Sequence, residues 1–407
     1  MTDAVVAPVE GASLPELRLK HREDRRISAG HLWIFSNEVD NERTPLARFA
    51  SGALCRVVGD RDRFLGYAYV NPHALICARI LGRDPGHPPG KSLFVHRLQV
   101  ALALRERSFQ TPWYRLAYGE SDGLPGVVFD RYGDVIVGQI GTAGMEARKP
   151  ELLAALEQVV GPRAVIWKND GGSRELEGLP SYVETALGEP PEHAWLEENG
   201  VRFKLPLGRG QKTGWFYDQA VNRREMLKYA KGARVLDVFA YLGAWGLAAA
   251  RAGAREVLCV DSSAAALTLL QESAAANDLG TVHTLRDDAF DALAALRAAG
   301  EKFDLVIVDP PAFVKRKRDL PKGIAAYRKL NQMAMQLLSR DGILVTCSCS
   351  HHLQQDELIA AVQQSARHLS RFAQVIAVGG HGPDHPIHPA IPETRYLKTL
   401  TCRVVHD

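Results

Sequence analysis

Val235–Gly246, VLDVFAYLGAWG, begins with an apolar run that predicts a buried strand. The run ends in a loop that carries Gly243 and Gly246 and leads into a helix-forming segment. Glycines at such a turn let a ligand approach the backbone and the N-terminus of the helix. The spacing is not GxGxxG, so a dinucleotide with its pyrophosphate group is less favoured. The stretch therefore predicts a strand, a ligand-binding loop and a helix in succession.

Strands and helices alternate regularly from this stretch onward. Five such units predict an α/β fold, a mostly parallel and doubly wound sheet of the Rossmann-like type. The expected strands are Arg234–Phe239, Glu256–Val260, Val282–Leu285, Phe303–Val308 and the apolar run within Gly342–His352. The expected helices are Gly246–Arg251, Ala264–Ala276, Asp291–Ala299 and Ile324–Leu338. Phe372–Val378 and Tyr396–Val405 are expected as further strands, and antiparallel pairing of the last one is open.

An acidic residue lies at or just after the end of each of the first three strands: Asp237, Asp261 and Asp288. A carboxylate in the place of Asp261 accepts both hydroxyls of a ribose. Asp288 is placed to accept from an adenine amino group, and Asp237 to face a positive charge. Three carboxylates without a phosphate-binding loop suit S-adenosylmethionine, although each aspartate alone is more often a helix cap or turn residue.

Val306–Asp319, VIVDPPAFVKRKRD, places Asp309 at a strand end before two prolines. The prolines make a rigid turn that can shape a base-sized pocket. Methyltransferases of exocyclic amines carry an aromatic residue directly after PP, whereas here Ala312 follows and Phe313 comes one place later. The basic run 315–318 is either a solvated loop or a contact for phosphate groups.

Two cysteines, Cys347 and Cys349, lie at the polar end of the strand in GILVTCSCSHH. A thiolate that adds to C6 of a pyrimidine makes C5 nucleophilic enough to accept a methyl group. Both cysteines point to the same face of a strand, so alternation cannot choose between them. Cys347 is nearer the apolar run and is predicted to fill core volume, which leaves Cys349 as the predicted nucleophile.

The chain before residue 234 is predicted to hold two smaller units. Ala53–Val58, Phe64–Val70 and Leu75–Leu81 read as strands, after a basic segment with His31 and Trp33. That segment is either a solvated face beside a packed tryptophan or the rim of an RNA-binding β-barrel. After a Gly/Pro-rich linker we expect helices Val95–Ser108 and Lys149–Val160 and strands Gly126–Asp130, Val135–Ile140 and Ala164–Lys168. Asp122, Asp130 and Asp134 are predicted to be turn residues. Glu198–Asn199–Gly200 predicts a hairpin.

These motifs together resemble the cytosine-5 methyltransferases of large-subunit ribosomal RNA, of the methyltransferase I type. The resemblance rests on VLDVFAYLGAWG, VDS, RDDAF, VDPPAF, TCSCSHH, GQKTGWFYDQAVNR and the tail RYLKTLTCRVV, and AGHLWIFSNEV resembles the start of a PUA domain. It implies a PUA-like RNA-binding domain over 13–88, a central α+β domain over 89–193 and a methyltransferase domain with an N-terminal β-hairpin over 194–407. The family's single motif cysteine falls on Cys349. As in that subfamily, Ala312 stands where many wider RNA enzymes carry a second cysteine, so the base for the C5 proton is unassigned.

The motifs and the resemblance together imply a set of site residues. Cys349 and Asp309 are the expected catalytic residues. The expected cofactor contacts are Lys212, Thr213, Phe216, Asp218, Gln219, Arg223, Asp237, Phe239, Ala240, Tyr241, Gly243, Asp261, Ser262, Asp288, Ala289 and Asp309. The expected substrate contacts are Pro310, Pro311, Phe313, Lys315, Arg316 and Lys317.

Composition is compatible with this interpretation. Among 407 residues the net charge is +3, which permits an anionic partner without demanding one. Six cysteines without a CxxC pair indicate a reducing, cytoplasmic compartment, and no signal peptide or membrane span is expected. His381, His385 and His388 lie in a Pro-rich loop without completing ligands, so no metal is expected.

Three functions stay open from the sequence. The first is S-adenosylmethionine-dependent formation of 5-methylcytosine in RNA, with 23S rRNA or a large-subunit precursor as partner and a possible homodimer. The second is an RNA exocyclic-amine N-methyltransferase that uses Asp309 and needs no thiol. The third is a non-catalytic rRNA-binding assembly factor with a vestigial site.

Overall fold

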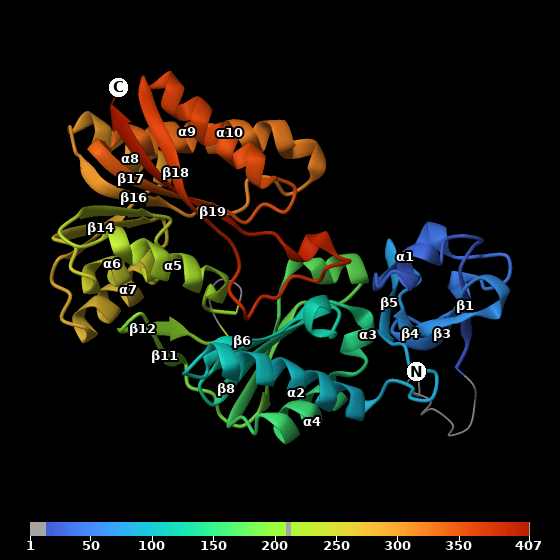
Figure 1. Ribbon diagram of the computed structural model, residues 1–407. Helices are drawn as coiled ribbons and strands as arrows, with labels where there is room; N and C mark the ends of the chain where they lie inside the picture. The colour runs from blue at the N-terminus through green and yellow to red at the C-terminus, as the bar shows by residue number, and fades with distance from the viewer. Residues whose placement is uncertain (1–13, 209–212, 407) are drawn as a thin grey trace.

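The computed structural model describes residues 14–208 and 213–406, which form three parts that follow one another along the chain (Figure 1). The first part, blue in Figure 1, is a five-stranded sheet in the order β1-β3-β4-β5-β2. Its interior is apolar and includes Leu17, Ile34, Val57 and Val70. The elements are β1 (Glu16–Arg18), α1 (Arg25–Ser28), β2 (Trp33–Phe35), β3 (Ala53–Val58), β4 (Phe64–Val70) and β5 (Ile76–Gly82), so the three predicted strands are confirmed, β5 with a shift of one residue.

The central part is a second five-stranded sheet, in the order β10-β9-β8-β7-β6. Helices α2 and α4 pack side by side against it (Figure 1). Its elements are α2 (Lys91–Ser108), β6 (Trp113–Tyr118), β7 (Val127–Tyr132), β8 (Val135–Ile140), α3 (Ala143–Glu146), α4 (Lys149–Val159), β9 (Ala164–Asn169) and β10 (Tyr182–Leu187). The strands β6 and β10 were not predicted.

One aspartate of the central part, Asp130, was wrongly interpreted as a turn residue, whereas Asp122 ends the short 3-10 turn Gly119–Asp122, as predicted. Asp130 lies inside β7, is fully buried and forms a two-point ion pair with Arg115 at 2.9 Å. Asp122 likewise pairs with buried Arg105 through two bonds of 2.7 Å. Both carboxylates therefore hold the central sheet together.

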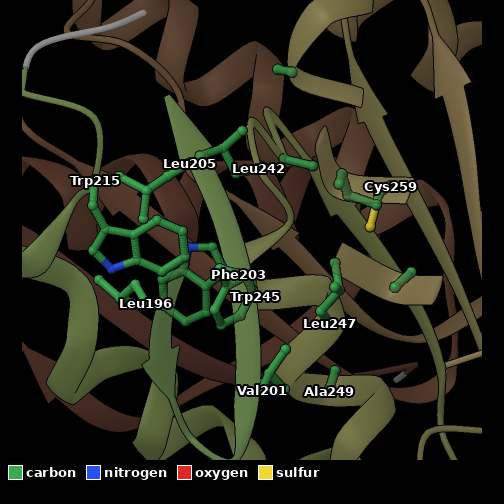
Figure 2. Packing of buried hydrophobic residues seen from close by; sticks show 14 of the residues in the cluster. Leu196, Val201, Phe203, Leu205, Trp215, Leu242, Trp245, Leu247, Ala249 and Cys259 are labelled. Carbon is green, nitrogen blue, oxygen red and sulfur yellow. The ribbon is translucent and has the colours of Figure 1, made fainter. Parts of the chain in front are cut away.

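The hairpin predicted at Glu198–Asn199–Gly200 is confirmed as β11 (His193–Glu198) and β12 (Val201–Pro206). Asn199 and Gly200 have φ angles of 52° and 73°, as a tight hairpin turn with two left-handed residues requires. The apolar face of β12 packs on helix α7, and the ring of Phe203 lies 4.7 Å from that of Trp215 (Figure 2). The hairpin thus forms one wall of the core beneath the large sheet.

The third part contains a seven-stranded sheet in the order β15-β14-β13-β16-β17-β19-β18. The five strands β13 to β17 run parallel, and β19 lies antiparallel between β17 and β18. The predicted doubly wound sheet is therefore confirmed, with an antiparallel last strand. The strands are β13 (Arg234–Val238), β14 (Glu256–Asp261), β15 (Val282–Arg286), β16 (Phe303–Val308), β17 (Leu338–Ser348), β18 (Arg371–Gly379) and β19 (Lys398–His406).

Helices cover both faces of this sheet (Figure 1). Val235 of β13 points into the core beneath α6 and α7, whereas its neighbours Leu236 and Val238 point into the core beneath α8, α9 and α10. The helices are α5 (Ala220–Met226), α6 (Ala244–Arg251), α7 (Ala264–Ala276), α8 (Ala289–Ala298), α9 (Leu320–Gln336) and α10 (Gln355–His368). Helix α9 begins earlier than predicted because Pro321 suits its first turn, and it ends before Leu338, which opens β17.

The loop between β18 and β19 reaches the central part (Figure 1). Asp384 accepts hydrogen bonds there from Arg105 and Arg115, and His385 is 1% exposed beside it. His381 stacks on His385 at 6.0 Å, so these histidines pack between two parts of the protein. No group of three or more potential metal ligands occurs within residues 14–208 and 213–406. No helix in these ranges is long and apolar enough to cross a membrane.

Candidate active site

The C-terminal edge of the parallel strands gathers most of the predicted site residues. Asp237, Asp261 and Asp309 come from the ends of β13, β14 and β16, and Cys349 follows the last residue of β17. Backbone hydrogen bonds hold the loops together there: Ala240 donates to Val260 at 3.0 Å and Asp309 donates to Val238 at 3.4 Å. This edge is where open α/β sheets bind ligands.

The loop after β13 has an unusual backbone. Phe239, Tyr241 and Gly243 have φ angles of 66°, 50° and 77°, all in the left-handed region. A Cβ at Gly243 would lie 2.2 Å from a methyl carbon of Leu247, so only glycine fits. Asp261 fixes the loop because its Oδ2 accepts from the Tyr241 amide at 2.8 Å.

Asp237 is fully buried within an apolar strand. Its Oδ2 accepts from the amide of Gly246 at 2.9 Å, and its buried Oδ1 has no hydrogen-bond partner among the described residues. Burial raises the pKa of Asp237 to about 7; the Gly246 bond opposes this rise, and the charges of Asp309 and Asp261 add to it. An unsatisfied buried carboxylate oxygen fits a bound cation such as the ammonium or sulfonium of S-adenosylmethionine.

Asp237 should make the stability of the cofactor-free protein depend on pH. An unfolded aspartate has a pKa of about 3.9. Between about pH 4 and pH 7 the folded chain therefore binds more protons than the unfolded chain, and the free energy of unfolding falls as pH rises. Asp237→Asn still accepts from Gly246 but does not titrate. Its free energy of unfolding should therefore rise by about 3 kcal/mol relative to that of wild type between about pH 4 and pH 7. Urea unfolding at several pH values measures this difference, and parallel curves for the two proteins would contradict it.

The predicted adenosine contacts lie at two neighbouring strand ends. Asp261 Oδ1 accepts from Ser263 at 2.8 Å, and Ser262 is exposed beside it. Asp288 caps α8 by accepting from the amides of Phe290 and Asp291, at 2.8 and 3.4 Å. Asp288 is exposed and Ala289 is buried beneath it, so Asp288 is a helix cap whose carboxylate also faces solvent.

Asp309 is held by two donors from outside its own strand. Gln219 Nε2 donates to Oδ1 at 3.0 Å and the indole nitrogen of Trp245 donates to Oδ2 at 3.1 Å. Burial raises the pKa of Asp309 to about 6, against the opposing effect of the Trp245 bond. Gln219 was predicted as a site residue, whereas Trp245 was missed, although it lies two residues after Gly243 in the loop motif.

The two cysteines differ in their surroundings. Cys347 is fully buried, and the Thr399 hydroxyl lies 3.5 Å from its sulfur. Burial raises the pKa of the Cys347 thiol well above its usual range. Cys349 lies beyond the end of β17 and is half-buried, with its sulfur 4.0 Å from the carbonyl oxygen of Pro310. Cys349 is thus the cysteine beside the DPP loop.

A buried hydroxyl network joins the DPP loop to β17. The Tyr327 hydroxyl lies 2.8 Å from Ser348 Oγ and 3.0 Å from Ser350 Oγ, and Ser350 Oγ accepts from the Val314 amide at 3.1 Å. Phe313 packs its ring 4.8 Å from that of Tyr327, so it supports the loop. Nothing in the sequence spacing signalled this network. Of the other predicted substrate contacts, Pro310 is buried, while Pro311, Lys315, Arg316 and Lys317 are exposed.

The segment before α5 borders the site. Arg223 is 1% exposed and makes two hydrogen bonds to Glu198 of the hairpin, at 2.5 and 2.7 Å. The ring of Phe216 packs edge-on against Tyr241 at 5.6 Å, and Asp218 accepts from the Tyr396 hydroxyl at 2.5 Å. Sequence reasoning missed Glu198 and Tyr396.

Thr213 and Lys212, in the same segment, were also predicted as cofactor contacts. The Thr213 hydroxyl donates to Asp130 of the central part, so its side chain is engaged away from the strand ends. Lys212 lies outside the described residues.

Comparisons with known proteins identify the family of this chain. Residues 155–391 match the model of an S-adenosylmethionine-dependent methyltransferase family, and residues 17–83 match a PUA-like domain. Ribosomal RNA large subunit methyltransferase I of Cronobacter sakazakii is 33% identical over 395 residues, or 96% of this chain and 99% of the relative. Its counterpart from Aliivibrio fischeri is 36% identical over 389 residues, or 94% and 97%. The chain belongs to the family of ribosomal RNA large subunit methyltransferase I.

The family assignment confirms the predicted fold class and the predicted cofactor, S-adenosylmethionine. A solved methyltransferase, SMU.776 in complex with SAH, has the same fold, with a TM-score of 0.82, 22% identity and coverage of 96% of this chain and 100% of that one. The structure of a Streptococcus mutans methyltransferase matches with a TM-score of 0.80, at 22% identity and with the same coverage. The unpaired Oδ1 of Asp237 and the glycine-dependent loop fit this cofactor.

Proposed function

We propose that the protein forms 5-methylcytosine in large-subunit ribosomal RNA, with 23S rRNA as the substrate and Cys349 as the nucleophile. The observation that carries the proposal is the position of Cys349, half-buried past the end of β17 and beside Pro310 of the DPP loop. A fold that needed the thiol only for packing would bury it as it buries Cys347. The relatives' name, ribosomal RNA large subunit methyltransferase I, supports the RNA class.

In this scheme Cys349 is the nucleophile, and the base that removes the C5 proton is unassigned. The Cys349 thiolate adds to C6 of the cytosine, and the electrons of the C5–C6 double bond move toward C5 and the ring. When bound, S-adenosylmethionine supplies the methyl group that C5 accepts. Loss of the C5 proton to a base and of the thiolate from C6 then restores the ring.

Asp309 binds the base in this scheme. Each of its carboxylate oxygens accepts one hydrogen bond from the protein and retains a second lone pair for a cytosine N4 amino group. Its raised pKa, about 6, also keeps part of the population protonated near neutrality, so that Asp309 can donate to N3 as charge develops there.

The surfaces around the site suit RNA in part. Lys315, Arg316 and Lys317 are exposed on the loop after Phe313, where they can contact phosphate groups. Trp33 was a candidate for the rim of an RNA-binding β-barrel, but its indole nitrogen donates to Glu120 of the central part at 2.8 Å. The half-buried Trp33 therefore joins two parts of the protein, as the packed alternative predicted.

A covalent trap tests the proposal. RNA that carries 5-fluorocytidine cannot lose its C5 substituent, so after methyl transfer the enzyme should remain bonded through Cys349. We expect a protein–RNA adduct in denaturing gels with cofactor, and peptide mass mapping should place it on Cys349. Unsubstituted RNA is the matched control. Methyl transfer without an adduct, with the methyl group on N4, would favour the amine methyltransferase, and no transfer at all would favour the assembly factor.

A further inference from the structure

Lys398 is a buried lysine beside the proposed nucleophile. It is the first residue of β19, pairs in register with Ser348 at the end of β17, and is 5% exposed. Its Nζ donates to the carbonyl oxygen of Ser350 at 2.6 Å. The lysine side chain therefore crosses the end of β17 and brings its ammonium group to the residue that follows Cys349.

No carboxylate of the described residues lies within 4 Å of this ammonium group. Burial lowers the pKa of Lys398 to about 8; the negative charge of the Cys349 thiolate opposes this, Arg395 lowers the pKa further, and Glu357 raises it. His351 and His381 also face it, since the charge of Lys398 lowers the pKa of both. Below about pH 8 the group is thus a cation, and Cys349 is the strongest source of compensating negative charge.

We propose that Lys398 is a positioning residue whose ammonium group stabilises the thiolate of Cys349 before it adds to cytosine C6. The proposal rests on the proposed role of Cys349. The thiol proton leaves to solvent, the sulfur holds the negative charge beside the ammonium group, and that charge moves into the base when the S–C6 bond forms. When the S–C6 bond breaks, the thiolate returns to the same environment, and Lys398 keeps its proton throughout.

A purely structural role for Lys398 makes a different prediction. In that case the lysine only ties β19 to the Ser350 carbonyl, and its removal would change stability without changing the reactivity of Cys349. The two roles separate in the pH dependence of thiol alkylation, because only the thiolate reacts with iodoacetamide.

The chain is well suited to this measurement. Five of its six cysteines, Cys55, Cys77, Cys259, Cys347 and Cys402, are buried, which leaves Cys349 as the accessible thiol. Cys349→Ala identifies the labelled site. Alkylation rates from about pH 6 to pH 10 would be compared for wild type, Lys398→Met and Lys398→Arg, with thermal unfolding and calorimetric cofactor binding as checks of folding.

We expect Lys398→Met to alkylate about tenfold more slowly than wild type near pH 7, with its profile displaced to higher pH, because an opposite charge nearby moves a thiol pKa by about one unit or more. Lys398→Arg, which keeps the positive charge, should stay within about threefold of wild type. A folded Lys398→Met protein with the wild-type profile would overturn the proposal.

The wild-type profile decides the matter if Lys398→Met does not fold. An apparent pKa of Cys349 below that of an ordinary cysteine, about 8.5, supports the proposal, and a value at or above it overturns the proposal. The covalent trap is independent of this result: adduct formation with an ordinary thiol profile would keep Cys349 as nucleophile and remove Lys398 from the scheme. Failure of the trap with a lowered profile would instead contradict the proposed function.

Discussion

Cys349→Ala should bind S-adenosylmethionine as wild type does and lose methyl transfer by about a thousandfold or more. The expected loss corresponds to about 4 kcal/mol of transition-state stabilisation, because cytosine C5 without a thiolate at C6 is too weak a nucleophile. Cofactor binding should stay intact because the loop after β13 and Asp261 hold their geometry without Cys349. Incorporation of a labelled methyl group into RNA measures transfer, and calorimetry measures binding.

Cys347→Ala is the matched control, since it removes a sulfur atom two residues earlier on the same strand. Cys347 is fully buried, so the variant should unfold about 1 kcal/mol more easily and still methylate RNA. Activity that survives in Cys349→Ala and disappears in Cys347→Ala would reverse the assignment of the two residues. Activity that survives in both variants would remove the thiol from the mechanism.

Arg223→Met should destabilise the protein by about 3 kcal/mol, because it leaves the Glu198 carboxylate without its partner in a largely buried place. The Glu198 side chain is 14% exposed, and Arg223 also donates to the carbonyl oxygen of Phe216 at 3.0 Å. Since Phe216 packs against Tyr241, a predicted cofactor contact in the loop after β13, we expect weaker cofactor binding as well. Urea unfolding and calorimetry measure the two effects.

The double variant Arg223→Met, Glu198→Gln provides the control for that prediction. A neutral glutamine still accepts from Trp215 and removes the unpaired charge, so the double variant should recover part of the lost stability. Arg223→Lys should fall between wild type and Arg223→Met because lysine cannot make both hydrogen bonds at once. A loss below about 1 kcal/mol in Arg223→Met would show that the pair contributes little.

Much of the methyltransferase part was predictable because its signals are local. Alternating apolar runs and glycine-bearing turns mark β13 to β17, and parallel strands place Asp237, Asp261, Asp309 and Cys349 at one edge without further information. The difference in burial between Cys347 and Cys349 was also predictable, because burial decreases along a strand with distance from its apolar run.

The parts that escaped prediction depend on contacts between distant segments. Trp245 and Glu198 act through Asp309 and Arg223, and spacing along the chain does not reveal such pairs. Asp130 resembles a turn residue because it precedes a tight turn, and only the ion pair with Arg115 allows its burial. The strand β10 has no fully buried residue, so its sequence gives no hydrophobic alternation signal.

The backbone strain in the loop after β13 affects which variants a screen for higher stability would favour. Phe239 and Tyr241 both hold left-handed backbone conformations, each of which costs a residue with a Cβ about 1 kcal/mol. Glycine or asparagine at these positions would relieve that strain, yet it would remove the ring that packs on Phe216 or loosen the loop that Asp261 fixes. Screening this enzyme for heat resistance alone would therefore tend to enrich variants that fold better and bind their cofactor less well. At Phe239 and Tyr241, higher stability of the fold therefore comes at the expense of cofactor binding.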